Sequence, residues 1–219
     1  MAYASRTSRR VSGAQLDNLE EAIAHASATH RPVNTMLTVH WENIAGESVS
    51  EDTVRQRDGQ LRELIRHWLN RRATTFHAIW VLERGKISDG LHVHHLLHLP
   101  SIPRSLRHDF IEKLEDWTGA AAGDPDTVEP NVIGVAAARQ PGESPVWRLE
   151  RFYGGDTGKR RLFRYITKTR PWDRECLIRG KRCGVSQSLG PKARSRMAYN
   201  AHQKPSDSPK AGSYSTGPA

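Results

Sequence analysis

Histidines are concentrated in one short segment of this sequence. Four of the chain's eleven histidines lie within residues 92–98, among apolar residues that have the character of a β-strand. Because side chains alternate between the two faces of a strand, His92 and His94 share one face, and His95 lies on the opposite, apolar face. The Cα atoms of His92 and His94 are then about 7 Å apart, so both rings can bind one metal ion.

A carboxylate is expected beside these two rings. Residues 76–84, "FHAIWVLER", form the preceding expected strand, and the connection "GKISDG" indicates an antiparallel hairpin. That pairing places Glu83 opposite His92. Two imidazoles and one carboxylate suit a divalent cation that keeps open positions for a substrate. The alternative is a pair of half-exposed strand histidines that hydrogen-bond to protein neighbours and bind no metal.

The rest of the pattern predicts an α+β fold that holds this strand. Strands are expected at 32–41, 76–84, 91–100, 131–139 and 145–152. Helices are expected at 12–27 with Ser12 as the cap, from Ser50 or Asp52 to about 73, at about 103–117, and within 155–170. We therefore expect a largely antiparallel five-stranded sheet, with helices on one face and the active site on the other.

Positive charge is concentrated in the second half of the chain. The whole sequence has a net charge of +9, and residues 151–204 alone contain fifteen Lys or Arg against three acids. So local an excess favours a nucleic-acid partner, although a solvated basic face without a partner has the same composition. We expect a basic arm and helix over 1–29, a catalytic domain over 30–175, a basic DNA-contacting extension over 176–204 and a disordered tail over 205–219.

Composition argues against a secreted or membrane protein. Two cysteines are too few for a disulfide framework, and their spacing fits no zinc motif closely. No apolar run approaches the roughly 20 residues of a membrane span, and the first residues lack the apolar core of a signal peptide. We expect a soluble, cytoplasmic protein.

The motif "HVH" resembles the His-hydrophobic-His motif of the HUH endonucleases, which cut single-stranded DNA. Within that superfamily the chain resembles a rolling-circle replication initiator. The resemblance implies that Glu83, His92 and His94 hold a divalent cation, Mg²⁺ or Mn²⁺. The family's first motif, an apolar strand containing Thr, matches "MLTVHW" at 36–41, and the matches together cover about residues 31–175. His95 and His98 depart from the pattern by adding spare ligands.

The family's Tyr-x-x-Lys motif matches Tyr165 and Lys168 in "RYITKT". The resemblance implies that Tyr165 attacks a phosphate of an exposed single strand and forms a 5′-phosphotyrosyl link, with Lys168 assisting. The partner is then single-stranded DNA at a replication origin. Because the chain has no phosphate-binding G-x-x-x-x-G-K-[ST] loop, a host helicase and polymerase are also expected. The expected nucleic-acid contacts are Arg161, Arg164, Arg179, Lys181, Arg182, Lys192, Arg194 and Arg196.

Several alternatives stay open at this point. Tyr153 is a rival nucleophile, and Tyr165 is equally compatible with a core aromatic beside Phe163 and Ile166. A cupin-like or other two-His-one-carboxylate enzyme also uses these ligands, but the next acid downstream of the histidines is Asp109, inside an expected helix. A non-catalytic DNA- or RNA-binding regulator needs only the basic second half of the chain.

Overall fold

The structure is a computed structural model. It describes residues 7–8, 11–45, 47–85, 90–100, 104–120, 132–136, 145–152, 163–167, 178–179 and 181–203.

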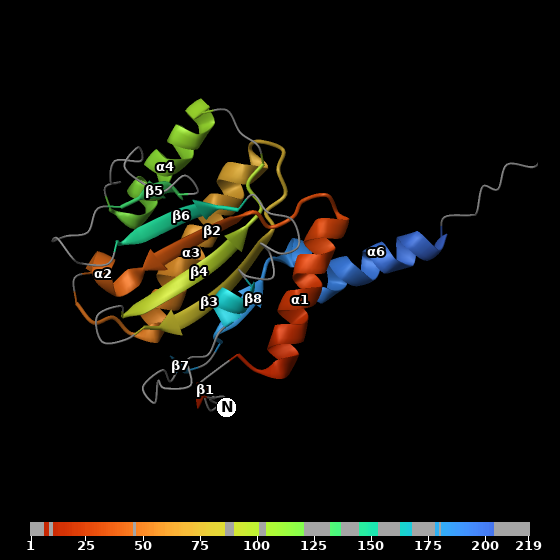
Figure 1. The fold of residues 1–219 in the computed structure, drawn as a ribbon, viewed down its shortest axis with the longest axis horizontal. Helices are drawn as coiled ribbons and strands as arrows, with labels where there is room; N and C mark the ends of the chain where they lie inside the picture. The colour runs from red at the N-terminus through yellow and green to blue at the C-terminus, as the bar shows by residue number, and fades with distance from the viewer. Residues whose placement is uncertain are drawn as a thin grey trace, which may run out of the picture.

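A six-stranded antiparallel sheet with the order β5-β6-β2-β4-β3-β8 forms the centre of the fold (Figure 1). Its strands are β2 Thr35–His40, β3 Ala78–Arg84, β4 Leu91–Leu97, β5 Val132–Val135, β6 Trp147–Arg151 and β8 Cys183–Val185. A separate pair joins β1 Thr7–Ser8 to β7 Ile178–Arg179. The predicted α+β class and antiparallel sheet are confirmed, and all five predicted strands are present.

The sixth strand, β8, was not expected from the sequence. It has only three residues, and its central Gly184 interrupts any apolar alternation. The glycine is required by packing, because a Cβ at this position would lie 2.2 Å from the Trp80 ring of the neighbouring strand. Strand β8 therefore extends the sheet beyond β3 through backbone pairing and close contact with Trp80.

The main helices begin at the caps that the sequence predicts. Helix α1, Gly13–Ala28, has a capping box in which Ser12 and Gln15 each bond the other's backbone N–H. Helix α3, Glu51–Asn70, is capped by the Ser50 side chain. The others are α2 Trp41–Ala45, α4 Arg104–Thr118, the 3-10 helix η2 Gln187–Leu189 and α6 Pro191–Gln203; residues 163–167 are also helical. None of the described helices has both the length and the apolar character needed to cross a membrane.

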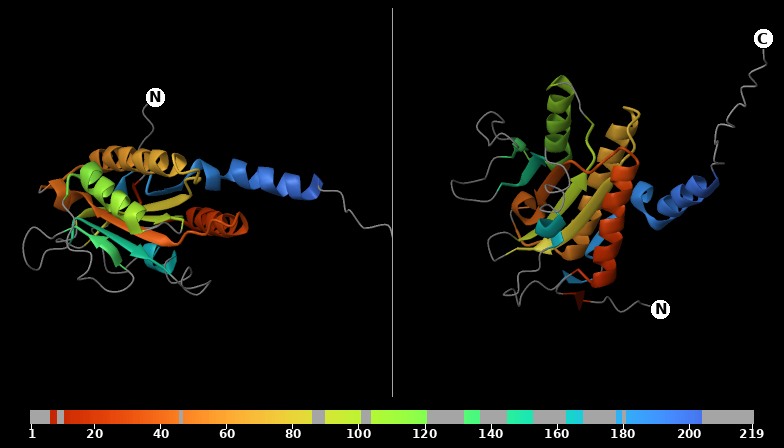
Figure 2. Two further views of the ribbon diagram at one scale, coloured as in Figure 1. Left: turned by 90° about the horizontal axis from the view of Figure 1, so that it is seen from above. Right: turned by 45° about the vertical axis from the view of Figure 1, so that its right-hand side comes forward.

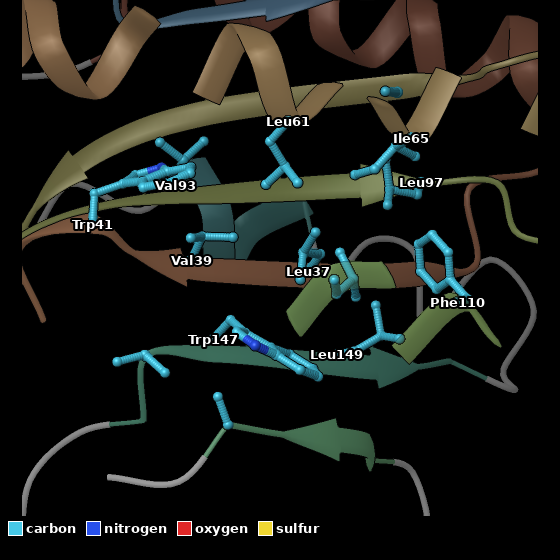
Figure 3. Close-up of a cluster of buried hydrophobic side chains, with 14 of the residues drawn as sticks. Leu37, Val39, Trp41, Leu61, Ile65, Val93, Leu97, Phe110, Trp147 and Leu149 are labelled. Carbon is cyan, nitrogen blue, oxygen red and sulfur yellow. The ribbon is translucent and has the colours of Figure 1, made fainter. Parts of the chain in front are cut away.

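The larger core lies between the sheet and helices α3 and α4. The odd-numbered row of β4, including Val93 and Leu97, faces this core as expected from the two-residue period. Figure 3 shows these side chains meeting Leu61 and Ile65 of α3 and Phe110 of α4. In the left view of Figure 2, both helices lie on the same side of the sheet.

The opposite face carries a second, smaller core, so helices are not confined to one face as expected. Leu96 and Met36 belong to the same face as His92 and His94, but they pack against α1 and against Ile166 of the short helix at 163–167. The left view of Figure 2 shows this short helix on the side of the sheet away from α3. The cause lies in the even-numbered row of β4 side chains, which is apolar at Leu96 and polar at His92 and His94. Helix α1 and the short helix cover the apolar half, and the polar half carries the histidines.

Candidate metal centre

Strand register brings the predicted ligands together. In the β3–β4 pairing Glu83 lies directly opposite His92, as the hairpin predicts. In the β2–β4 pairing His40 lies opposite His92, and Thr38 lies opposite His94. Since opposite residues of paired strands share a face, five polar side chains meet on the half of this face that lies away from Leu96.

The three predicted ligands have a spacing that fits one cation. Glu83 Oε2 lies 3.6 Å from His92 Nε2 and 3.6 Å from His94 Nε2. The ligand atoms of all three residues lie within 4.8 Å of one another. Two ligands that each sit about 2.1 Å from one ion are themselves about 3–4 Å apart. Glu83, His92 and His94 therefore form a candidate metal site, and its donor set of two nitrogens and one oxygen suits a divalent cation.

Hydrogen bonds at the far side of each ring turn Nε2 towards Glu83. His92 Nδ1 lies 3.2 Å from the carbonyl oxygen of Gly90, which can only accept, so Nδ1 carries the proton. His94 Nδ1 lies 2.8 Å from the buried Thr38 hydroxyl. Such partners fix ring orientation and tautomer in metal sites. Gly90 has a φ of +52° and packs against Glu42, whose side chain leaves no room for a Cβ.

The electrostatics of the site favour the ligand forms of Glu83 and His94 at neutral pH. Burial raises the pKa of Glu83, but the adjacent imidazoles of His92 and His94 outweigh it and lower that pKa to about 2. Burial lowers the pKa of His94, with the charge of His92 adding to the effect and Glu83 opposing it. A charged carboxylate and a neutral imidazole are the states that bind a cation.

Tyr165 lies beside this cluster. Its ring centroid is 5.5 Å from that of His94, with the ring planes at 69°. Tyr165 is 44% exposed, whereas its neighbour Ile166 is fully buried in the smaller core. The short helix thus uses Ile166 for packing and places Tyr165 beside His94, at the surface of the metal-bearing face.

The remaining predicted site residues differ in their placement. Arg161, Lys168 and the rival Tyr153 lie outside the described residues, and only the backbone of Arg179 is described, in β7. Arg164 is exposed on the short helix.

Among the basic residues at the C-terminal end of the fold, Lys181, Lys192 and Arg196 are exposed and Arg182 is buried. Arg194 has a structural contact: it bonds the Leu189 carbonyl, Asn18 and Glu21, and so attaches α6 to α1.

His95 and His98, the spare histidines of the motif, have partners elsewhere. His95 is fully buried on the opposite face of β4, where its Nε2 lies 2.8 Å from Asp58 Oδ1 of α3. Arg62, one turn further along α3, pairs with the same carboxylate. His98 Nδ1 lies 2.8 Å from the carbonyl oxygen of Pro32.

Sequence reasoning missed three polar residues around the histidine strand. His40 stacks on His92 with ring centroids 5.1 Å apart, and the alternation within "TVH" could have placed it on the face of Thr38. Asp58 could have been found because it interrupts the apolar stripe of α3 at helical spacing. No sequence signal identified Arg148, whose position depends on the pairing of β6 with β2.

Comparison with models of known families, with curated proteins and with solved structures found no match. Geometry therefore identifies this chain as an α+β protein with an antiparallel sheet and a candidate His-x-His-plus-Glu metal site beside an exposed tyrosine.

Proposed function

We propose that the chain is a metal-dependent endonuclease and strand transferase of the HUH class, which nicks single-stranded DNA as a rolling-circle replication initiator. The observation that carries the proposal is the meeting of the exposed Tyr165 with the Glu83, His92 and His94 cluster on one face of the sheet. These parts come from three separate segments of the chain, and two of those segments carry the HVH and Tyr-x-x-Lys patterns that resemble HUH motifs.

Glu83, His92 and His94 would hold the cation, Mg²⁺ or Mn²⁺. When bound, it polarises the scissile phosphate and stabilises negative charge on the phosphate oxygens. Thr38 and the Gly90 carbonyl keep both imidazoles turned towards that position through their bonds to the Nδ1 atoms.

Tyr165 is the proposed nucleophile. Its phenolic oxygen forms a bond to phosphorus, and the bond between phosphorus and the 3′-oxygen of the preceding nucleotide breaks. The products are a 5′-phosphotyrosyl link and a free 3′-hydroxyl, which takes up a proton. Because a phenol has a pKa near 10, its proton must be removed and the phenolate favoured by nearby positive charge, a role that we assign to Lys168.

The basic residues supply the proposed contacts to DNA. Lys181, Lys192 and Arg196 are exposed, as phosphate contacts require. Single-stranded DNA at a replication origin is the proposed substrate, and a helicase and a polymerase from the host would extend the freed 3′-hydroxyl.

A covalent-adduct assay tests this function. The protein is incubated with a pool of labelled single strands of randomised sequence in Mg²⁺ or Mn²⁺, and the label on denatured protein is measured. We expect a metal-dependent adduct that Tyr165→Phe abolishes, with unchanged retention of the pool on a filter. Tyr199→Phe, in α6, is the matched control and should keep the adduct.

Two results would contradict the proposal. An adduct that survives Tyr165→Phe and disappears with Tyr153→Phe would assign the nucleophile to Tyr153. Binding of the pool without any adduct in either metal would favour a non-catalytic regulator.

A further inference from the structure

The metal-bearing face continues past the cluster onto strand β6. Thr38 of β2 lies opposite His94 of β4 on one side and opposite Arg148 of β6 on the other. Because residues opposite one another across a sheet share a face, the Arg148 side chain emerges on the same face as His94. Neighbouring strands are about 4.8 Å apart, so the Cα atoms of these two residues are about 10 Å apart across β2.

We propose that Arg148 binds a backbone phosphate of the single strand whose scissile phosphate lies at the metal centre. This inference rests on the proposed function, because it takes single-stranded DNA as the ligand of this face. The line from His94 to Arg148 runs perpendicular to the β-strands, so the bound strand crosses β2 at Thr38.

The Arg148 side chain is accessible to a ligand and has one acidic neighbour. Its side chain is 40% exposed, and its Nε lies 2.7 Å from Glu150 Oε1, whose side chain is 16% exposed. Glu150 is two residues further along β6 and therefore shares the same face. A guanidinium has five N–H donors in one plane, which suits two-pronged binding of a phosphate.

Arg151, on the same strand, is an arginine whose contacts are structural. It lies on the opposite face, and its guanidinium bonds the backbone carbonyls of Leu99 and Pro100, which follow the end of β4. Arg148 lies on the other face of β6, in the polar row that also carries Thr38 and His94. This difference in face and surroundings separates the two arginines of β6.

The experiment measures the salt dependence of binding. Fluorescently labelled (dT)20 is titrated with protein in EDTA at several NaCl concentrations, and the slope of log K against log[NaCl] is determined. Each phosphate contact to single-stranded DNA contributes about 0.7 to that slope, so Arg148→Gln should reduce its magnitude by about 0.7. Arg148→Lys should restore part of the loss, since the charge returns without the planar fork.

Arg66→Gln is the matched control. Its side chain is 38% exposed and is ion-paired with Glu63 at 2.6 Å, but it lies on α3, on the other side of the sheet. We expect its slope to equal that of the unmodified protein. Because Arg148→Gln leaves Glu150 with less compensation, the double variant Arg148→Gln/Glu150→Gln is measured too, and its slope should stay reduced by about 0.7.

Failure of this inference can be told apart from failure of the proposed function. An unchanged slope in the Arg148 variants, or no binding of (dT)20 at low salt, overturns the contact whatever the adduct assay shows. A reduced slope supports it, and if Tyr165 then forms no adduct, only the proposed cleavage fails. Thermal melting of each variant checks that the fold is intact before the slopes are compared.

Discussion

The two faces of strand β4 use the same residue type in opposite ways. On the face towards α3, His95 is fully buried and its Nε2 lies 2.8 Å from Asp58. On the other face, His92 and His94 approach Glu83 with separations of 3.6 Å. The first spacing is that of a direct hydrogen bond, and the second leaves the distance that a shared cation would span.

The partners explain the difference. Asp58 belongs to α3 and also pairs with Arg62, so the His95 contact is part of a buried network of three charged or polar side chains. Burial lowers the pKa of His95 well below its usual range, with Arg62 adding to the effect. Glu83 belongs to a neighbouring strand and has two imidazoles beside it. A histidine's role here follows from the face on which it lies and from where its carboxylate partner originates.

The largest expected effect is the loss of folding stability when Asp58, the carboxylate on the α3 side of β4, is removed. Asp58→Ala leaves Arg62 and His95 without their buried carboxylate, and removing one partner of a buried ion pair costs about 3–5 kcal/mol. Denaturant unfolding measures this change. Glu83→Ala is the matched control, because its side chain is 15% exposed against 2% for Asp58 and its partners His92 and His94 are imidazoles, so we expect a smaller loss. Equal losses in the two variants would remove the distinction between the faces.

The next largest effect is the loss of metal affinity when a candidate ligand is removed from the metal-bearing face. His94→Ala removes one of the three candidate ligands and should weaken Mn²⁺ binding by more than about 100-fold, since even loss of a residue that only orients a ligand costs about 10–100-fold. Titration calorimetry measures the affinity. The control is His95→Gln, which changes the neighbouring histidine on the face of β4 towards α3. Its Mn²⁺ affinity should stay within a few-fold of that of the unmodified protein. If both variants bind Mn²⁺ as the unmodified protein does, the cluster is not a metal site.

A smaller effect is expected from Thr38. Thr38→Val keeps the side-chain shape but removes the hydroxyl that bonds His94 Nδ1 at 2.8 Å. Without this partner the ring loses its fixed tautomer, so Mn²⁺ affinity should fall by about 10–100-fold. Thr35→Val is the control, because Thr35 is equally buried in β2 but lies on the opposite face. Identical affinities in the two variants would show that Thr38 does not orient the site.

The smallest effect is the pH dependence of stability from a histidine outside both faces. His77 bonds the Arg31 carbonyl, and burial, opposed by that bond, lowers its pKa to about 4. Because the unfolded chain binds the proton more tightly, stability from neutral His77 is present above pH 6.5 and is lost as pH falls towards 4. His77→Gln should reduce the loss between pH 6.5 and 5.5 by about 1 kcal/mol in denaturant unfolding. If the free energy of unfolding of the unmodified protein exceeds that of His77→Gln by more at pH 5.5 than at pH 6.5, the pKa of His77 is not lowered by folding.

The local sequence pattern was sufficient to predict the histidine strand and its hairpin with the preceding strand. The two-residue period separated His95 from His92 and His94, and a short connection determined that Glu83 pairs with His92. Long-range pairing was not predictable in the same way. Arg148 reaches the metal-bearing face because β6 pairs with β2, more than a hundred residues earlier in the chain.

The short β8 was missed for a different reason. Its three residues are held by backbone bonds to β3 and by the contact of Gly184 with Trp80, and neither leaves a periodic signal in the sequence. Covering of the metal-bearing face by α1 was also missed, since it depends on which helix fills the apolar end of the row near Leu96.

Anomalous diffraction from crystals soaked in Mn²⁺ tests the central claim most directly. We predict one strong peak within bonding distance of Glu83 Oε2, His92 Nε2 and His94 Nε2, adjacent to the Tyr165 ring, and its loss in crystals of His94→Ala. A peak bound elsewhere, or no peak at this cluster at millimolar Mn²⁺, would contradict the account.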